Sequence, residues 1–300
     1  MGNNAKFRAM ARKLAAVLLA LVLICALAAV PAGAAYGKGT KFVVLGDSIP
    51  AGEGASEEAK AYARLIADKK GFALSNLAVG GHKSSDLLEI LANDAEAKKA
   101  IRNADIIDLN IGGNDLLASN VITLVLRVVF LKDSSTIDPY IAEFSERFEQ
   151  IIKQIRKLNG SAKFIVQTLY NCMEGIPLVG DAYEIAVTKL NAVYYDYLKA
   201  HPGAYEIADI YGAYKGRDGL VFRDRLHPSD AGHEKIAEVL TAMIDSAPKT
   251  QAALTTPVKN PDPNLLQKTG SFLYAAYDYL GYWLSIYTPW ELAKKAFSFM

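Results

Sequence analysis

Five short, mostly apolar segments recur between residues 41 and 210, and the first of them is a β-branched run. Each has the length of a strand, and most are followed by glycine, asparagine or other loop-forming residues. Continuous apolar runs of this kind are typical of strands that are buried on both faces of a sheet. We therefore predict strands over Lys41–Gly46, Phe72–Ala78, Ala104–Ile111, Lys163–Leu169 and Tyr205–Ile210.

Segments with helical spacing of apolar positions separate these strands. They are Glu57–Lys70, Ser84–Leu91, Leu116–Leu131, Ile141–Leu158, Tyr183–Lys199 and Ser229–Ile244. Alternating strands and helices require crossover connections, which give a parallel sheet with helices on both faces. The sequence therefore predicts an α/β domain over residues 41–246. In such sheets ligands bind beyond the carboxyl ends of the strands, so the loops there are the place to look for chemistry.

Both ends of the chain differ from this central pattern. Basic residues precede an apolar run over Leu14–Val30, and Ala32-Gly33-Ala34 fits a cleavage signal. This is the layout of a secretory signal peptide over 1–35, although a retained membrane anchor also fits and a buried helix is a third interpretation. Residues 247–264 have the composition of a linker. Residues 265–300 form an aromatic, amphipathic tail that suits a membrane surface, packing on the domain, or a short span.

Composition adds few constraints. The apolar fraction of 51% and the charged fraction of 22% are those of a globular domain, and a formal charge of +1 gives no reason to expect a nucleic-acid partner. Cys25 lies in the leader, so Cys172 has no internal partner for a disulfide. We interpret Cys172 as a small buried apolar residue rather than a catalytic thiol. The predicted leader indicates that the domain works outside the cytoplasm, either secreted or membrane-associated, and the cysteine usage fits this expectation.

Two polar segments follow the first two predicted strands. Gly46-Asp47-Ser48 presents a serine at the rim of the sheet, where it is either a nucleophile or the N-cap of a helix. The segment from Asn76 to Gly81 offers backbone amides that can approach a substrate oxygen closely, or it is a plain strand-to-helix turn.

Two more segments follow the third and fifth strands. Asn114 after Gly112-Gly113 is either an oxyanion donor or a helix cap. His227 can take a proton from serine, and Asp224, three residues earlier, can hold the far ring nitrogen. The alternative is that Asp224 and His227 only shape a loop. Ser229 is expected to cap the last helix.

The other histidines are weaker candidates for the base. His82 directly follows the segment from Asn76 to Gly81 and is the one competitor of His227 for the role of base. His201 and His233 are expected to be solvated. A metal-dependent phosphoesterase needs several histidine and aspartate ligands, and too few histidines follow strands here. No metal and no cofactor is therefore expected.

Taken together in this order, the four segments resemble those of the GDSL-type, or SGNH, esterases and lipases. The matching residues are Gly46-Asp47-Ser48 with Gly52 and Gly54, then Asn76 and Gly81, then Gly112, Asn114 and Asp115, and finally Asp224, His227 and Pro228. The resemblance covers about residues 41–246. Ile49 replaces the usual leucine, and no G-x-S-x-G elbow of the α/β-hydrolase kind occurs.

The resemblance implies a flavodoxin-like three-layer α/β/α sandwich with a five-stranded parallel sheet. It also implies that Ser48 is the nucleophile, His227 the base and Asp224 its orienting carboxylate. The oxyanion would be held by the amides of Ser48 and Gly81 and the side chain of Asn114. Gly80 also offers an amide, and Gly81 is preferred for its spacing from Asn76.

The predicted function is a serine ester hydrolase that works through an acyl-enzyme. The apolar segment Leu116–Leu131, which is a core helix, a lid or part of an acyl pocket, and the aromatic tail favour lipid or acyl esters. Two alternatives stay open: a carbohydrate O-acetyl esterase of the same fold, and a non-catalytic, membrane-associated binding protein. Residues 265–300 are the predicted membrane contact.

Overall fold

The computed structural model describes residues 36–118, 127–131, 133–176 and 178–246. The predicted leader over 1–35, linker over 247–264 and aromatic tail over 265–300 lie outside these residues. Among the helices that the structure describes, none has the length and apolar character of a membrane span.

Five parallel strands form one sheet in the order β2-β1-β3-β4-β5. They are β1 (Lys41–Gly46), β2 (Ala73–Asn76), β3 (Ile106–Asn110), β4 (Lys163–Gln167) and β5 (Glu206–Ala208). The central strand β3 is buried along its whole length, as expected for a strand covered on both faces. The prediction of a five-stranded parallel sheet is confirmed.

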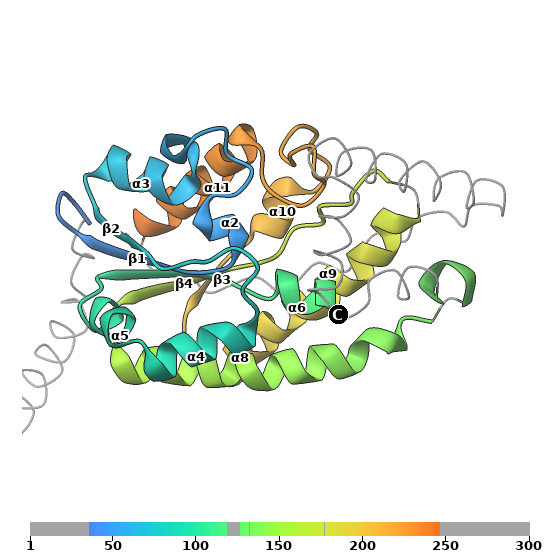
Figure 1. Cartoon of the computed structure of the whole chain (residues 1–300), viewed down its shortest axis with the longest axis horizontal. Coiled ribbons are helices and arrows are strands. Elements are labelled where there is room, and N and C mark those ends of the chain that lie inside the picture. Colours follow the sequence, from blue (N-terminus) through green and yellow to red (C-terminus); the bar gives the residue numbers. More distant parts are fainter. Residues whose placement is uncertain (1–35, 119–126, 132, 177, 247–300) are drawn as a thin grey trace, which may run out of the picture. The chain divides into compact units, whose positions relative to one another are not determined.

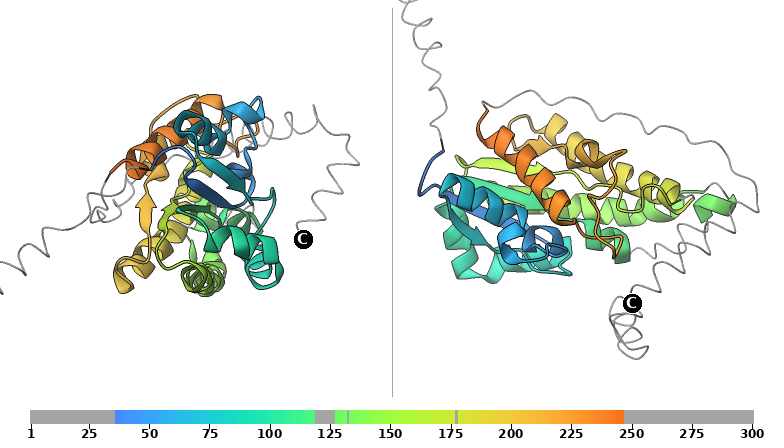
Figure 2. Two further views of the ribbon diagram at one scale, coloured as in Figure 1. Left: turned by 90° about the vertical axis from the view of Figure 1, so that its left-hand side faces the viewer. Right: turned by 90° about the horizontal axis from the view of Figure 1, so that it is seen from above.

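Helices cover both faces of this sheet and complete three layers (Figure 1). One layer holds α3 (Tyr62–Lys70), α10 (Ile210–Tyr214) and α11 (Asp230–Ile244). The other holds α4 (Ser84–Asn93), α5 (Ala95–Arg102), α8 (Asp138–Leu158) and α9 (Val179–Ala200). The left view of Figure 2 shows the same division, with the blue and orange helices above the strands and the green and yellow ones below.

Short elements follow the strands or link the longer helices. They are α2 (Ser48–Ala51), η1 (Glu58–Lys60), α6 (Gly113–Ala118), the π-helical turn η2 (Arg127–Leu131) and η3 (Ser135–Ile137). The predicted helix over 116–131 thus begins earlier, at Gly113, and its residues 119–126 lie outside the described part of the chain.

One predicted helix is divided in the structure, and one helix was not predicted. The helix predicted over 57–70 is interrupted at Ala61, whose backbone is extended, and α3 begins at Tyr62. There the amide of Tyr62 donates to Nδ1 of His233 at 3.3 Å, a contact from α11 that spacing along the chain does not reveal. The helix predicted over 84–91 is intact within α4, and the unpredicted helix α5 begins after Asp94, whose side chain accepts hydrogen bonds from the amides of Glu96 and Ala97.

The strand order places the site. The chain runs from β1 to β2 on one side and later returns to β3 on the other side of β1. Connections on opposite faces leave a crevice at the carboxyl ends of β1 and β3, where ligands bind in doubly wound sheets. The segments that carry Ser48 and Asn114 begin at these two strand ends.

Candidate active site

Ser48 is held where β1 gives way to the short helix α2. Gly46, with φ of +136°, ends the strand, and a Cβ atom there would lie 1.8 Å from the carbonyl oxygen of Asn110. The side chain of Asp47 caps α2 by accepting a hydrogen bond from the amide of Ile49 at 3.2 Å. Ser48, the first residue of α2, is 7% exposed. Close backbone approach and capping therefore fix the hydroxyl at the rim of the sheet.

Asp224 and His227 are held in one tight loop before α11. Oδ1 of Asp224 accepts the amides of Leu226 and His227 at 2.9 and 3.0 Å. Its Oδ2 lies 2.5 Å from Nδ1 of His227. With both oxygens occupied, the carboxylate fixes the orientation of the ring and keeps a proton on Nδ1.

The loop after β1 and the loop before α11 meet. Nε2 of His227 lies 2.9 Å from Oγ of Ser48, although the two residues are 179 positions apart in the chain. The structure thus brings Ser48, His227 and Asp224 into one hydrogen-bonded series. His82 instead contributes its carbonyl oxygen, which accepts from the side chain of Asn114 at 2.9 Å.

The charges around this series shift the pKa values of its members. Burial lowers the pKa of His227, but the hydrogen bond and charge of Asp224 outweigh it, aided by Glu53 and Asp47, so that the pKa is raised. Burial disfavours ionisation of Asp224, yet the hydrogen bonds from His227 keep the pKa of this carboxyl below its ordinary value. Burial also raises the pKa of Asp47 to about 7. An ionised Asp224 beside a readily protonated imidazole is the arrangement that general-base chemistry requires.

The structure ties some of the residues considered for the oxyanion to Ser48 more directly than others. Asn114 is buried in α6 and lines the same pocket as Ser48. Gly81 has φ of +82° and open space around the position of a Cβ atom. A Cβ atom on Gly80 would lie 3.9 Å from Cβ of Ser48, so Gly80 is close to the nucleophile as well. The choice between the amides of Gly80 and Gly81 stays a prediction.

An apolar pocket opens beside the nucleophile. Ser48, Asn114 and His227 line it together with Ile49, Leu117, Leu169, Tyr170, Cys172, Tyr183 and Leu226. Tyr170, Cys172 and Tyr183 are each 4% exposed, so the wall that they form is part of the core. A pocket of this composition suits an apolar group bound next to the serine hydroxyl.

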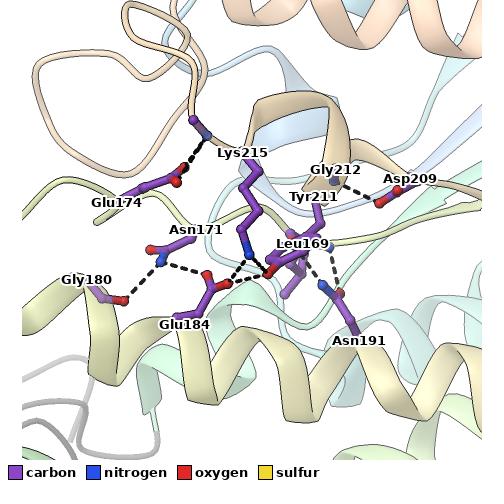
Figure 3. A network of polar contacts seen from close by, with 11 residues as sticks. Leu169, Asn171, Glu174, Gly180, Glu184, Asn191, Asp209, Tyr211, Gly212 and Lys215 are labelled. Atoms are coloured by element: carbon purple, nitrogen blue, oxygen red, sulfur yellow. Dashed lines mark hydrogen bonds and ion pairs between the residues drawn. The ribbon is translucent and has the colours of Figure 1, made fainter. Parts of the chain in front are cut away.

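Polar contacts fix that wall from behind (Figure 3). The side chain of Asn191 both accepts from and donates to the backbone of Leu169, each at 2.8 Å. Glu184 on α9 accepts from Asn171 at 2.9 Å and from Lys215 at 2.8 Å, and also accepts from Tyr211. Side chains from α9, from α10 and from Lys215 directly after α10 thus hold the segment after β4 in place (Figure 3).

Cys172 behaves as the sequence suggested. It is a free, buried thiol, and burial raises its pKa to about 12. A thiol with so high a pKa is protonated near neutral pH and is a poor nucleophile. Among the residues described, no group of histidine, cysteine, aspartate or glutamate side chains is arranged to hold a metal ion.

Two residues near the site were not identified from the sequence. His233 was expected to be solvated, and this was wrong: it is fully buried in α11, where Nε2 lies 3.1 Å from the carbonyl oxygen of Glu53. Oε2 of Glu53 in turn lies 3.2 Å from Nε2 of His227. Both contacts join residues more than 170 positions apart, and no local motif signals them.

Most of the described domain is similar to known proteins. A family model described as the GDSL-like lipase/acylhydrolase family matches residues 44–235. The chain belongs to this family. As a GDSL hydrolase it is a carboxylic ester hydrolase, and the resemblance and the fold class inferred from the sequence are confirmed.

Two curated proteins and a solved structure are similar to this GDSL hydrolase. The chain is 32% identical over 206 residues to the uncharacterised protein YpmR of Bacillus subtilis, with 65% of this chain and 77% of YpmR covered. It is 27% identical over 217 residues to the spore germination lipase LipC of Bacillus licheniformis, with 67% and 95% covered. The crystal structure of the lipase Lip_vut3 from a goat rumen metagenome has a TM-score of 0.55 at 25% identity, with 68% and 96% covered.

Proposed function

We propose that this GDSL hydrolase cleaves acyl esters through a covalent acyl-enzyme on Ser48. The observation that carries the proposal is the pair of distances around His227, 2.9 Å from Nε2 to the Ser48 hydroxyl and 2.5 Å from Nδ1 to the Asp224 carboxylate. This order of groups lets the hydroxyl attack an ester carbonyl while the imidazole accepts its proton.

The remaining steps use the same groups. The amides of Ser48 and Gly81 and the side chain of Asn114 stabilise the negative charge that forms on the carbonyl oxygen. His227 gives the proton to the leaving oxygen as the bond between that oxygen and the carbonyl carbon breaks, and the acyl group stays bonded to Oγ of Ser48. A water molecule, deprotonated by His227, then releases the acid and restores the hydroxyl. Asp224 stabilises the imidazolium in both steps without taking the proton.

The proposed substrate is an ester with an apolar acyl group. The pocket beside Ser48 is lined by Leu117, Leu169, Tyr170, Cys172 and Tyr183, which offer mostly carbon to a bound group. Burying an acyl chain there gains about 0.8 kcal/mol for each CH₂ group removed from water. The proposed place of action is outside the cytoplasm, supported by the leader-like composition of residues 1–35.

Hydrolysis of a series of p-nitrophenyl esters, from acetyl to long acyl, tests the proposal with Ser48→Ala as the matched variant. We expect kcat/KM to rise beyond acetyl and Ser48→Ala to lower it by at least about 10⁴-fold. The variant should keep the thermal unfolding midpoint of the parent. Retained activity in Ser48→Ala would reject the nucleophile. Activity confined to acetyl esters would favour the O-acetyl esterase, and no activity, with no fluorophosphonate labelling, the binding protein.

A further inference from the structure

Glu53 is placed by its backbone between the nucleophile and the base. It follows Gly52, which ends α2, and its amide donates to the carbonyl oxygen of Ser48 at 3.0 Å. Its own carbonyl oxygen accepts from Nε2 of the buried His233 at 3.1 Å. The start of the Glu53 side chain is therefore fixed relative to both Ser48 and α11.

The side chain reaches from there into the site. Oε2 of Glu53 lies 3.2 Å from Nε2 of His227, the nitrogen that also faces Ser48. Oε1 lies 2.0 Å from where a Cβ atom on Gly80 would be, so glycine at that position leaves room for the carboxylate. About half of the side chain, 51%, is exposed. The carboxylate is thus at the mouth of the site, between His227 and Gly80.

This position borders the alcohol part of an ester. In the proposed reaction Nε2 of His227 protonates the leaving oxygen, so that oxygen comes close to Nε2 and hence to Glu53. The acyl group has a separate place, because the apolar pocket beside Ser48 is lined by Leu169, Tyr170 and Cys172 and not by Glu53. Charge on the alcohol part therefore meets the Glu53 carboxylate, whereas charge on the acyl part does not.

We propose that Glu53 is a specificity-determining residue, whose carboxylate makes the site prefer esters with a cationic alcohol part over esters with an anionic one. The inference rests on the proposed function, because it needs His227 to act on the leaving group. Glu53 attracts a positive leaving group and repels a negative one over a few ångströms, in surroundings half open to water. Solvent and salt weaken this interaction but do not cancel it at low ionic strength.

Glu53 also faces the base, and this gives a second readout. The charged or titratable groups around His227 are Asp224 in its own loop, Glu53 after α2, Asp47 at the cap of α2, and His233 on α11. The carboxylate of Glu53 favours the protonated ring, because Nε2 can donate to it only when it carries a proton. Removing the charge of Glu53 therefore makes the ring easier to deprotonate.

Two thioesters of matched size test the proposal: butyrylthiocholine, with a cationic leaving thiol, and the butyryl thioester of 2-mercaptoethanesulfonate, with an anionic one. Thiol release is followed colorimetrically at low salt. We expect Glu53→Gln to lower the cation-to-anion ratio of kcat/KM by about tenfold. Glu58→Gln, an equal change of charge on the exposed η1, should leave the ratio unchanged. Glu53→Asp, which keeps the charge, should recover part of it.

A neutral ester supplies the pH readout. With p-nitrophenyl butyrate, the acid limb of kcat/KM in Glu53→Gln should move to lower pH, a shift that loss of packing alone does not produce. If Glu53→Gln folds poorly, the parent protein gives the answer, because 1 M salt should shrink its cation-to-anion ratio. If the cation-to-anion ratio of kcat/KM is the same in the parent, in Glu53→Gln and in Glu53→Asp, and 1 M salt does not change it, the proposal is overturned. The ester hydrolase function would stand. Retained hydrolysis by Ser48→Ala would instead reject the proposed function.

Discussion

The surroundings of His227 and of His233 differ in one respect that decides their chemistry. The two residues are six positions apart, and both are buried, with 7% and 0% of their surface exposed. Yet the pKa of His227 is raised and that of His233 is lowered. Burial opposes the charged imidazolium in both cases, so the partners of the rings make the difference.

The partners explain the direction of each shift. His233 accepts from the amide of Tyr62 at Nδ1 and donates to the carbonyl of Glu53 at Nε2, which satisfies a neutral ring on both sides. His227 donates from Nδ1 to the Asp224 carboxylate, while its Nε2 accepts from Ser48 and lies 3.2 Å from the Glu53 carboxylate. A buried histidine is thus structural when backbone groups occupy both nitrogens, and suited to act as a base when a carboxylate occupies one and a hydroxyl the other.

Asp224→Asn should have the largest effect on catalysis, because it gives His227 a neutral partner. An amide can favour the wrong tautomer and cannot stabilise the imidazolium, so we expect kcat to fall by about 10³- to 10⁴-fold. Hydrolysis of p-nitrophenyl butyrate measures it. The control is Asp218→Asn, an exposed aspartate in the preceding segment, which should retain the parent rate. A rate within tenfold of the parent in Asp224→Asn would mean that the carboxylate does not set the chemistry of His227.

The sequence predicted the contact between Asp224 and His227, which the structure contains, and predicted the environment of His233 incorrectly. Asp224 and His227 are three residues apart, so their contact can be inferred from spacing alone. The sheet was also predictable, because its central strands β1, β3 and β4 are short, largely apolar and buried. The partners of His233 come from α3 and from the turn after α2, more than 170 positions away, and its neighbours Glu234 and Lys235 suggested an exposed helix face.

Glu53 was missed for the same reason. In the sequence it is a lone glutamate between two glycines, and its relation to His227 exists only once the loop after β1 and the loop before α11 have met. The break at Ala61 has a similar origin, because the amide of Tyr62 is satisfied by His233 rather than by a local cap. Local spacing thus predicts contacts within an element, while contacts between distant loops require the fold.

His233→Ala tests whether the buried His233 stabilises the fold. It leaves the amide of Tyr62 and the carbonyl of Glu53 without their partner and opens a cavity between α3 and α11. We expect the free energy of unfolding to fall by about 2–4 kcal/mol. Urea unfolding measures it, with His201→Ala as the control, because His201 is exposed and its ring contacts Tyr197, four residues earlier in the chain. Equal midpoints for the two variants would contradict a structural role for His233.

The smallest expected effect concerns the pH dependence of the parent enzyme. The active form needs a neutral His227, so kcat/KM should rise with pH, and because the pKa of His227 is raised, the midpoint should lie above the ordinary value of 6.5. His233, whose pKa is lowered, stays neutral through this range and adds no step to the pH profile.

Asp47, whose pKa is about 7, loses its proton in the same range. Each newly ionised Asp47 makes His227 harder to deprotonate, so the limb should be broader than that of a single group. In Asp47→Asn, which keeps an acceptor for the amide of Ile49, the limb should become steeper and move to lower pH. A limb of unchanged shape and position in this variant would show that Asp47 does not couple to the base.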